Sequence, residues 1–290
     1  MPHLENHAGL APAPAVPSPE GSTGQQPRTA SGNPGIGVPV SIWPHAPVPD
    51  SGPGPGCVSC AGGASGPDAA QVITAFSRPG ELVVIPAARN GVLVAAAAAA
   101  GRRVLGLTPG PRSRQRVLTC LDGVDPLLRH LAVVRRGGPA LLLEAGHPEA
   151  GQAALAIAGG GGPAPPRACP AAGSPGGGEP AAGPGVMYAA CQRALRPGGV
   201  LAVITASTPC PGGLRDDPGE AITQARAAGL IYAQHIVALH APIAGSQLAP
   251  GPDDTARPDQ AAGLAAAHVH VRIHSDLLVF TKPGKEPADD

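Results

Sequence analysis

The chain has 290 residues and a formal net charge of zero, so its overall charge gives no reason to expect a nucleic-acid partner. Its 42 Gly and 38 Pro approach the share typical of low-complexity sequence, while only 2 Phe, 2 Tyr and 1 Trp exclude a core rich in aromatic residues. The composition is that of one α/β domain with long appendages, whose core is built from Ala, Val, Leu and Ile.

Residues 1–65 are predicted to form a low-complexity, largely disordered arm. Within the arm, "VPVSIWPHAPVPD" (38–50) holds the only Trp and is a candidate to dock on the domain. The chain starts without a basic segment followed by an apolar run, and "VLVAAAAAAG" is too short to span a bilayer. We therefore expect a soluble, cytoplasmic protein with no membrane partner, whose six cysteines are reduced thiols.

Regular periodicity begins near residue 66. A helix leads into "RPGELVVI", whose residues 81–85 form a fully apolar strand of the kind found in parallel sheets covered on both faces. The elements expected next are a turn at 86–91, a helix near 92–100, a strand at 103–107, a helix near 111–121, a third strand at 139–145 ("PALLLEA") and a fourth at 152–158. A Gly/Pro-rich insertion follows at about 159–184.

The last third repeats the helix–strand unit. "GVMYAACQRALRPGGVLAVITAS" predicts a helix with Met187, Cys191 and Leu195 on one face and Arg196 in its last turn, followed by a buried strand. Asp217 is the expected N-cap of the next helix, before a strand at about 230–239 and one or two closing strands in "HVHVRIHSDLLVFTKP". The alternation predicts a Rossmann-like doubly wound, mostly parallel sheet over residues 66–285, with a short tail at 286–290.

In this order, "RPGELVV", "LRPGG" and "LLVFTKP" resemble the class I S-adenosylmethionine-dependent methyltransferases. The likeness is greatest to DNA amino-methyltransferases, which modify adenine N6 or cytosine N4. The resemblance implies a Rossmann-like fold, S-adenosylmethionine as the cofactor and a flipped DNA base as the substrate.

The resemblance also implies a cofactor turn of the form "DPxxGxGT" after the first strand, whose acid and glycines contact the cofactor. Here Pro86 and Gly91 match the pattern, whereas Ile85 replaces the acid and Arg89 replaces the first glycine. The second strand of the family ends in an acid that holds the ribose hydroxyls, and Thr108 stands there in this chain. Pro86, Gly91 and Thr108 are thus the candidate cofactor-binding residues.

Two further family positions are altered. The acid that reads the adenine amino group falls at Gly146, with Glu144 or Glu149 as possible substitutes. The "SPPY" or "DPPY" motif, which holds and stacks on the reacting base, is replaced by a run of glycines that offers no side-chain acceptor and no aromatic face. The residues in this run are Gly159, Gly160, Gly161 and Gly162. No catalytic residue is therefore predicted.

The sequence thus supports two interpretations. The first is a DNA methyltransferase-like protein with weak or lost catalysis, a pseudoenzyme that still belongs to the methyltransferase lineage. The second is a non-catalytic DNA-binding or protein-interaction module on the same fold. The segment from Arg78 to Arg136 holds ten arginines against three acids, which favours phosphate contact but also fits ordinary solvated arginines. The candidate DNA contacts are Arg102, Arg103, Arg112, Arg114 and Arg116.

No metal site is predicted. Cys57 and Cys60 have metal-ligand spacing, but the chain has no second pair at a suitable distance. His268, His270 and His274 alternate with apolar residues, a pattern more typical of the solvent face of a strand than of a chelating pair. His235 and His240 are interpreted as structural histidines with hydrogen-bond partners.

Overall fold

The structure is a computed structural model that describes residues 38–44, 66–89, 91–159, 183–205, 208–210, 213–215, 217–239, 243–244, 247–248 and 274–284. Most of the predicted arm, the glycine- and proline-rich stretch from 160 to 182 and the closing residues from 285 onward lie outside these ranges. None of the helices in the described part of the chain is long and apolar enough to cross a membrane.

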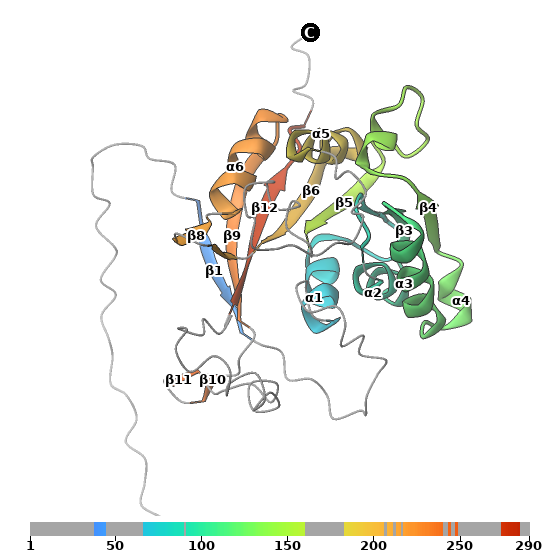
Figure 1. Ribbon diagram of the computed structural model, residues 1–290, viewed down its shortest axis with the longest axis horizontal. Helices are drawn as coiled ribbons and strands as arrows, with labels where there is room; N and C mark the ends of the chain where they lie inside the picture. The colour runs from blue at the N-terminus through green and yellow to red at the C-terminus, as the bar shows by residue number, and fades with distance from the viewer. Residues whose placement is uncertain are drawn as a thin grey trace, which may run out of the picture. The chain divides into compact units, whose positions relative to one another are not determined.

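One eight-stranded sheet forms the centre of the domain, in the order β1-β9-β12-β6-β5-β2-β3-β4 (Figure 1). Its strands are β1 (Val40–Trp43), β2 (Leu82–Ile85), β3 (Arg103–Thr108), β4 (Ala132–Arg136), β5 (Ala153–Gly159), β6 (Leu195–Thr205), β9 (Ile231–Leu239) and β12 (His274–Thr281). Only β12 runs antiparallel to its neighbours β6 and β9, while the other pairs are parallel. This confirms the predicted Rossmann-like, mostly parallel α/β fold.

The helices connect the parallel strands. They are α1 (Gly66–Phe76), α2 (Val92–Ala99), α3 (Pro111–Asp122), α4 (Pro126–Arg129), the 3-10 helix η2 (Pro139–Leu143), α5 (Pro184–Ala194) and α6 (Asp217–Ala227). Two small antiparallel hairpins stand apart from the main sheet. They are β7 (Thr208–Cys210) with β8 (Gly213–Arg215), and β10 (Ile243–Ala244) with β11 (Gln247–Leu248).

Two hydrophobic clusters cover the two faces of the sheet. Along β2, Val83 and Ile85 belong to the cluster that includes α1, α2 and α3, whereas Leu82 and Val84 belong to the cluster that includes α5 and α6. This division follows from the alternation of side chains along a strand. Because both faces are covered, β2 is apolar throughout, as the sequence predicted.

The docking segment around Trp43 becomes the edge strand β1, which pairs in parallel with β9. On the face covered by α1, the Trp43 ring stacks on Phe76 with 6.2 Å between ring centroids. On the same face, the Gln234 side chain donates to Ser41 Oγ at 2.8 Å. The sheet therefore includes a segment that precedes residue 66, where the domain was expected to begin.

Two sequence predictions were wrong. The third strand is Ala132–Arg136, and "PALLLEA" forms η2, because a short apolar run does not distinguish a strand from a helical turn by its periodicity. The helix over "GVMYAACQRA" ends at Ala194, and Leu195 and Arg196 already belong to β6. Pro197 explains this early end, because proline disfavours the helical conformation in the residue before it.

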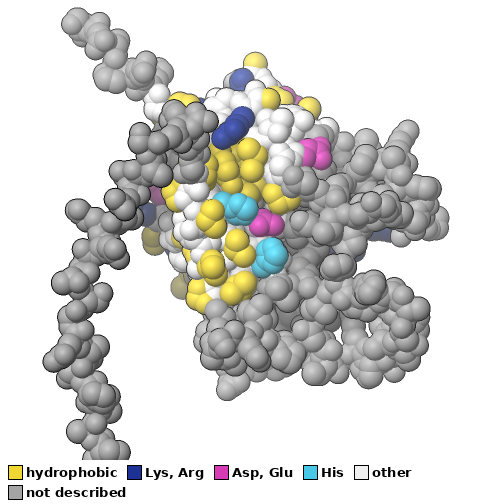
Figure 2. All heavy atoms as spheres, turned by 90° about the vertical axis from the view of Figure 1, so that its left-hand side faces the viewer, with side chains coloured by type: hydrophobic (Ala, Val, Ile, Leu, Met, Phe, Trp, Pro, Cys, Tyr) yellow, Lys and Arg dark blue, Asp and Glu magenta, His cyan; other side chains and the backbone are white. Residues whose placement is uncertain are grey.

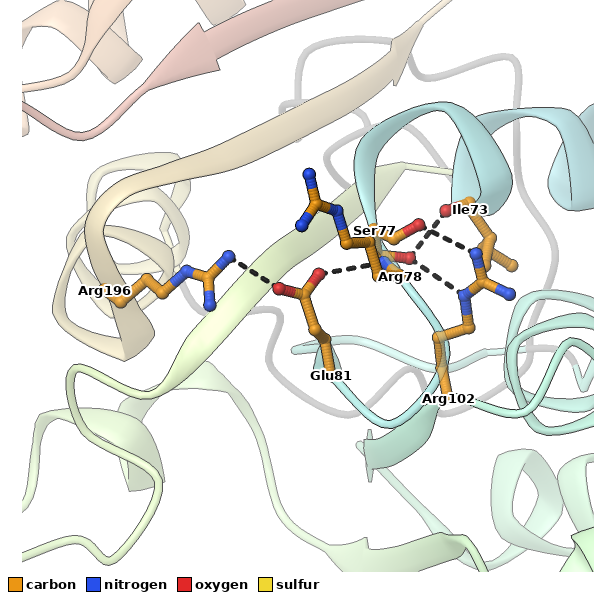
Figure 3. A network of polar contacts seen from close by, with 6 residues as sticks. All are labelled: Ile73, Ser77, Arg78, Glu81, Arg102 and Arg196. Carbon is orange, nitrogen blue, oxygen red and sulfur yellow. Dashed lines mark hydrogen bonds and ion pairs between the residues drawn. The ribbon is translucent and has the colours of Figure 1, made fainter.

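A polar network joins the amino ends of β2 and β6 (Figure 3). The Glu81 carboxylate accepts a hydrogen bond from the Arg78 backbone N–H at 2.8 Å and one from Arg196 Nη2 at 2.7 Å. These contacts, led by the Arg78 N–H, hold the pKa of Glu81 below its ordinary value, against the opposing effect of burial. Glu81 thus connects the "RPGE" turn with the "LRPGG" segment.

The network continues on either side of Glu81. The Arg102 guanidinium is buried and donates to the Ser77 carbonyl at 2.7 Å, to Ser77 Oγ at 3.2 Å and to the Ala100 carbonyl. Beyond β12, the Lys282 ammonium donates to the carbonyls of Gln192 and Leu195 at 2.8 and 2.7 Å. The three segments that carry the family resemblance therefore meet at this one edge of the sheet.

Replacing Glu81 with Gln is expected to lower the free energy of unfolding at pH 7 by about 1 kcal/mol, because Arg196 is half exposed and its ion pair is partly screened. The folded-state pKa of Glu81 is lowered, so its contribution is present above the unfolded pKa of about 4.3 and is lost as the pH falls through the folded value. Urea denaturation at pH 7 and at pH 3 measures both effects.

The matched control is Glu144→Gln, which removes an exposed carboxylate and should leave the stability unchanged. A Glu81→Gln protein as stable as the wild type at pH 7, or one whose deficit persists unchanged at pH 3, contradicts the assignment.

Candidate functional site

The strand order points to one place for a ligand. From β2 the chain proceeds through β3 to β4 on one side, and β5 and β6 lie on the other side. In open α/β sheets, ligands bind beyond the carboxyl ends of the strands where the order reverses in this way. The candidate site is therefore built from the residues that follow β2 and β5, with those at the end of β3.

The end of β2 presents no polar side chain. Ile85, which stands where the resemblance implies an acid, is 2% exposed and packs in the core against α1 and α2. Pro86 is also buried. A carboxylate at position 85 would lose its hydration in this apolar environment, which is costly for an unpaired charge. The isoleucine is consistent with a strand end that serves packing.

The turn after β2 is held by neighbouring elements. The Ala88 N–H donates to the Leu107 carbonyl of β3 at 2.7 Å. A Cβ atom added to Gly91 would lie 2.3 Å from Cys120 Cβ, and the φ of Gly91 is −89°, which any residue adopts. The glycine is therefore required by the close approach of α3, and not by its backbone conformation. Arg89 is exposed at the surface, while Asn90 lies outside the described residues.

Thr108 lies at the end of β3, where it is fully buried. Its hydroxyl donates to the Arg135 carbonyl of β4 at 3.1 Å. This hydrogen bond satisfies a carbonyl at the edge strand and uses the only proton of the hydroxyl. A contact between Thr108 and a cofactor stays a prediction, and the arrangement gives Thr108 a structural role.

The acidic substitutes considered for Gly146 have separate environments. Glu144 is exposed, whereas Glu149 is partly buried and pairs with Arg135 at 3.3 Å and with His147 Nδ1 at 3.1 Å. Arg135 therefore already compensates the charge of Glu149, whereas Glu149 Oε2 and His147 Nδ1 lie close without forming a hydrogen bond.

Gly159 ends β5 in a conformation that few other residues adopt. Its φ is +128°, and a Cβ atom there would lie 2.2 Å from the Ile204 carbonyl oxygen of β6. Both facts indicate that the backbones of β5 and β6 approach closely at their carboxyl ends. The other residues of the glycine run, Gly160, Gly161 and Gly162, lie outside the described residues.

The arginines predicted to contact DNA fall into different places. Arg102 was a wrong choice, because it is 6% exposed and its guanidinium is used in the network around Ser77. Arg103 is exposed at the amino end of β3. Arg112, Arg114 and Arg116 are exposed on α3, which begins at the opposite, carboxyl edge.

The cysteine and histidine candidates do not form a metal site in the described part of the chain, where no cluster of three potential ligands occurs. Cys57, Cys60, His240, His268 and His270 lie outside that part. Burial raises the pKa of Cys191 to about 12, so its thiol is not a nucleophile near neutral pH.

Sequence reasoning missed one polar group at the carboxyl edge. His235 Nε2 lies 2.8 Å from Asp276 Oδ1, which joins β9 to β12. The structural role expected for His235 agrees with this contact. The signal for its partner was an acid inside the apolar strand "HSDLLVFT", which calls for a compensating group.

The sequence matches no family model and no curated protein. Several solved structures are similar in their arrangement of elements. The [4+2]-cyclase SpnF is 14% identical, with 74% of this chain and 80% of that chain covered and a TM-score of 0.47. The precorrin-6y C5,15-methyltransferase from Geobacter metallireducens is 10% identical, with 74% and 89% covered and a TM-score of 0.45.

A TehB-like SAM-dependent methyltransferase from Corynebacterium glutamicum is 14% identical, with 74% and 86% covered and a TM-score of 0.40. The fold assignment rests on the strand order and register, and not on these similarities.

Replacing Gly159 with Ala is expected to lower the free energy of unfolding by about 2–4 kcal/mol, through backbone strain together with the collision with β6. Gly146→Ala is the matched control, because Gly146 also has a positive φ (+75°) but nothing lies within 4 Å of an added Cβ. The control should lose only about 1 kcal/mol. Chemical denaturation measures both, and equal losses would show that β5 and β6 do not meet closely.

Proposed function

We propose that this protein belongs to the S-adenosylmethionine-dependent methyltransferase lineage, with ancestry among enzymes that methylate base amines, and that its cofactor binding and catalysis are weak or lost. The proposal rests on the residues that end three strands at the candidate site. Ile85 is buried in the core, the Thr108 hydroxyl donates a hydrogen bond to β4, and Gly159 packs on the β6 backbone.

The lineage is supported by topology together with sequence. Across the sheet, the neighbouring strands β4-β3-β2-β5-β6 follow the first five positions of the doubly wound order 3-2-1-4-5-6. The segments that resemble class I methyltransferases, namely "RPGEL", "LRPGG" and "FTKP", are joined by Glu81, Arg196 and Lys282. A resemblance whose parts contact one another in the fold is stronger support than separate short matches.

The loss of binding follows from the chemistry of the cofactor. The ribose of S-adenosylmethionine offers hydroxyl donors, and a carboxylate is the strongest acceptor for them. The segments after β2, β3 and β5 read "PAARNG", "PG" and "GGG", and contain no acid. These strand ends therefore supply no carboxylate for either the ribose or a base amine, and the Thr108 hydroxyl already donates its proton within the sheet.

Calorimetric titration with S-adenosylmethionine is expected to give no heat of binding at micromolar concentrations. In thermal unfolding, 1 mM cofactor would stabilise the protein by about 4 kcal/mol if the Kd were about 1 μM, but by less than about 0.5 kcal/mol if the Kd is about 1 mM or weaker, so Tm should barely change. A cooperative circular-dichroism melt is the control for folding. A micromolar Kd would overturn the proposed loss of binding.

The second candidate function is salt-sensitive DNA binding through α3. Arg112, Arg114 and Arg116 are exposed, and none of them has an ion pair with another described residue. Unpaired guanidinium groups at the surface are available to phosphate. This observation favours the DNA-binding alternative over a purely structural domain.

The triple change of Arg112, Arg114 and Arg116 to Gln should lower the slope of log K against log salt by about 2–3 for duplex DNA, because each phosphate contact contributes about 0.9. Arg78→Gln, at the amino edge of the sheet, is the matched control and should leave the slope unchanged. Fluorescence anisotropy between 50 and 200 mM salt, about the range in which such contacts weaken, measures the slope. Wild-type protein that fails to bind, or a triple variant with the wild-type slope, would exclude the α3 surface.

A further inference from the structure

We infer that the carboxyl ends of β6 and β9, together with the amino end of the antiparallel strand β12, form a site for an amphipathic amine, with the Asp276 carboxylate and the Thr205 hydroxyl as the groups that receive the ammonium. This site lies apart from the ends of β2 and β5, since β6 and β12 follow β5 in the sheet. The site is formed by side chains of this chain alone, so binding there does not require S-adenosylmethionine.

Asp276 is the first component. The residue is 7% exposed, so the carboxylate has lost most of its hydration. Among the described residues, the polar contact of its side chain is with His235 Nε2, at 2.8 Å through Oδ1. A carboxylate has two oxygens and about four acceptor positions, so one contact leaves Oδ2 able to accept from another donor. The negative charge also raises the pKa of Tyr232, although burial of the Tyr232 ring is the larger cause.

Thr205 is the second component. It lies directly opposite Asp276 in the antiparallel pairing of β6 with β12, and opposed residues point to the same face of a sheet. Thr205 Oγ1 is buried and has no hydrogen-bond partner in the part of the chain that the structure describes. A buried hydroxyl without a partner is rare in folded proteins and is a position at which a ligand donor gains a hydrogen bond. The carboxylate and this hydroxyl therefore lie on the same face of the sheet, on adjacent strands.

The surroundings of the pair are apolar. Val237 stands opposite Asp276 on β9, and Ile42 stands opposite Val237 on β1. Val40 and Ile42 are 67% and 64% exposed, which is high for aliphatic side chains on a sheet face. Figure 2 shows hydrophobic side chains around histidine and acidic ones on the side of the molecule that carries β1. A ligand that covers this surface needs hydrocarbon beside its polar group.

The charge of the site selects an ammonium. A carboxylate repels anionic ligands, and the described residues hold no cluster of three groups that could ligate a metal ion. An ammonium donates up to three hydrogen bonds, enough for Asp276 Oδ2 and Thr205 Oγ1 together. His235 acts as a positioning residue, because its ring N–H fixes the carboxylate while the second oxygen remains for the ligand.

The test uses phenethylamine, with 2-phenylethanol as the uncharged probe of the same hydrocarbon, in an NMR chemical-shift titration of the whole chain without cofactor. Wild-type protein should bind the amine with a millimolar Kd and the alcohol roughly tenfold more weakly. Asp276→Asn, which keeps the shape of the side chain, should weaken amine binding roughly tenfold, and Thr205→Val should weaken it about threefold.

Glu220→Gln is the matched control, because it removes an exposed carboxylate from α6 without touching the pair. Its affinity for the amine should equal that of the wild type. Three outcomes would overturn the inference. They are equal binding of amine and alcohol, no binding of the amine at about 20 mM, and wild-type affinity in Thr205→Val. If Asp276→Asn fails to fold, Thr205→Val and the comparison of the two probes decide it.

Discussion

The fold depends on hydrogen bonds at the amino edge of the sheet between segments that are far apart in the sequence. Glu81 joins its own turn to Arg196, which lies 115 positions away. Lys282 reaches the carbonyls at the end of α5, and its own backbone N–H donates to the Gly199 carbonyl. These contacts position β6 and β12 relative to β2. Because these strands belong to one sheet, the contacts also position the two faces on which the helices pack.

The carboxyl edge has a different character. Where the sequence resemblance implies a cofactor and a base, Ile85, Gly91 and Gly159 make packing contacts with the core, α3 and β6. The side-chain network of Glu81, Arg196 and Lys282 thus lies at the edge of the sheet opposite the switch point. Because that network does not involve the switch-point residues, the fold does not require ligand-binding groups there.

The sequence predicted the elements with strong patterns and failed where a pattern was short. The apolar strand at β2 and the glycine-bearing turn before α2 were found at their positions. The segment "PALLLEA" was mistaken for a strand, because an apolar run of that length fits either element. At the site, the apolar character of position 85 was visible in the sequence. The burial of Arg102 was not, because its partners on Ser77 are 25 residues away.

The sequence by itself determined the class of fold and showed that no acid follows β2 or β3, since the apolar periodicity and the residue types are local properties of the chain. Only the tertiary structure decided what the remaining residues do. It directed the Thr108 hydroxyl to β4 and brought Asp276 beside His235 and opposite Thr205. The physical reason is that hydrogen bonding and burial depend on which strands become neighbours, and the register of β12 between β6 and β9 is fixed by contacts across the whole domain.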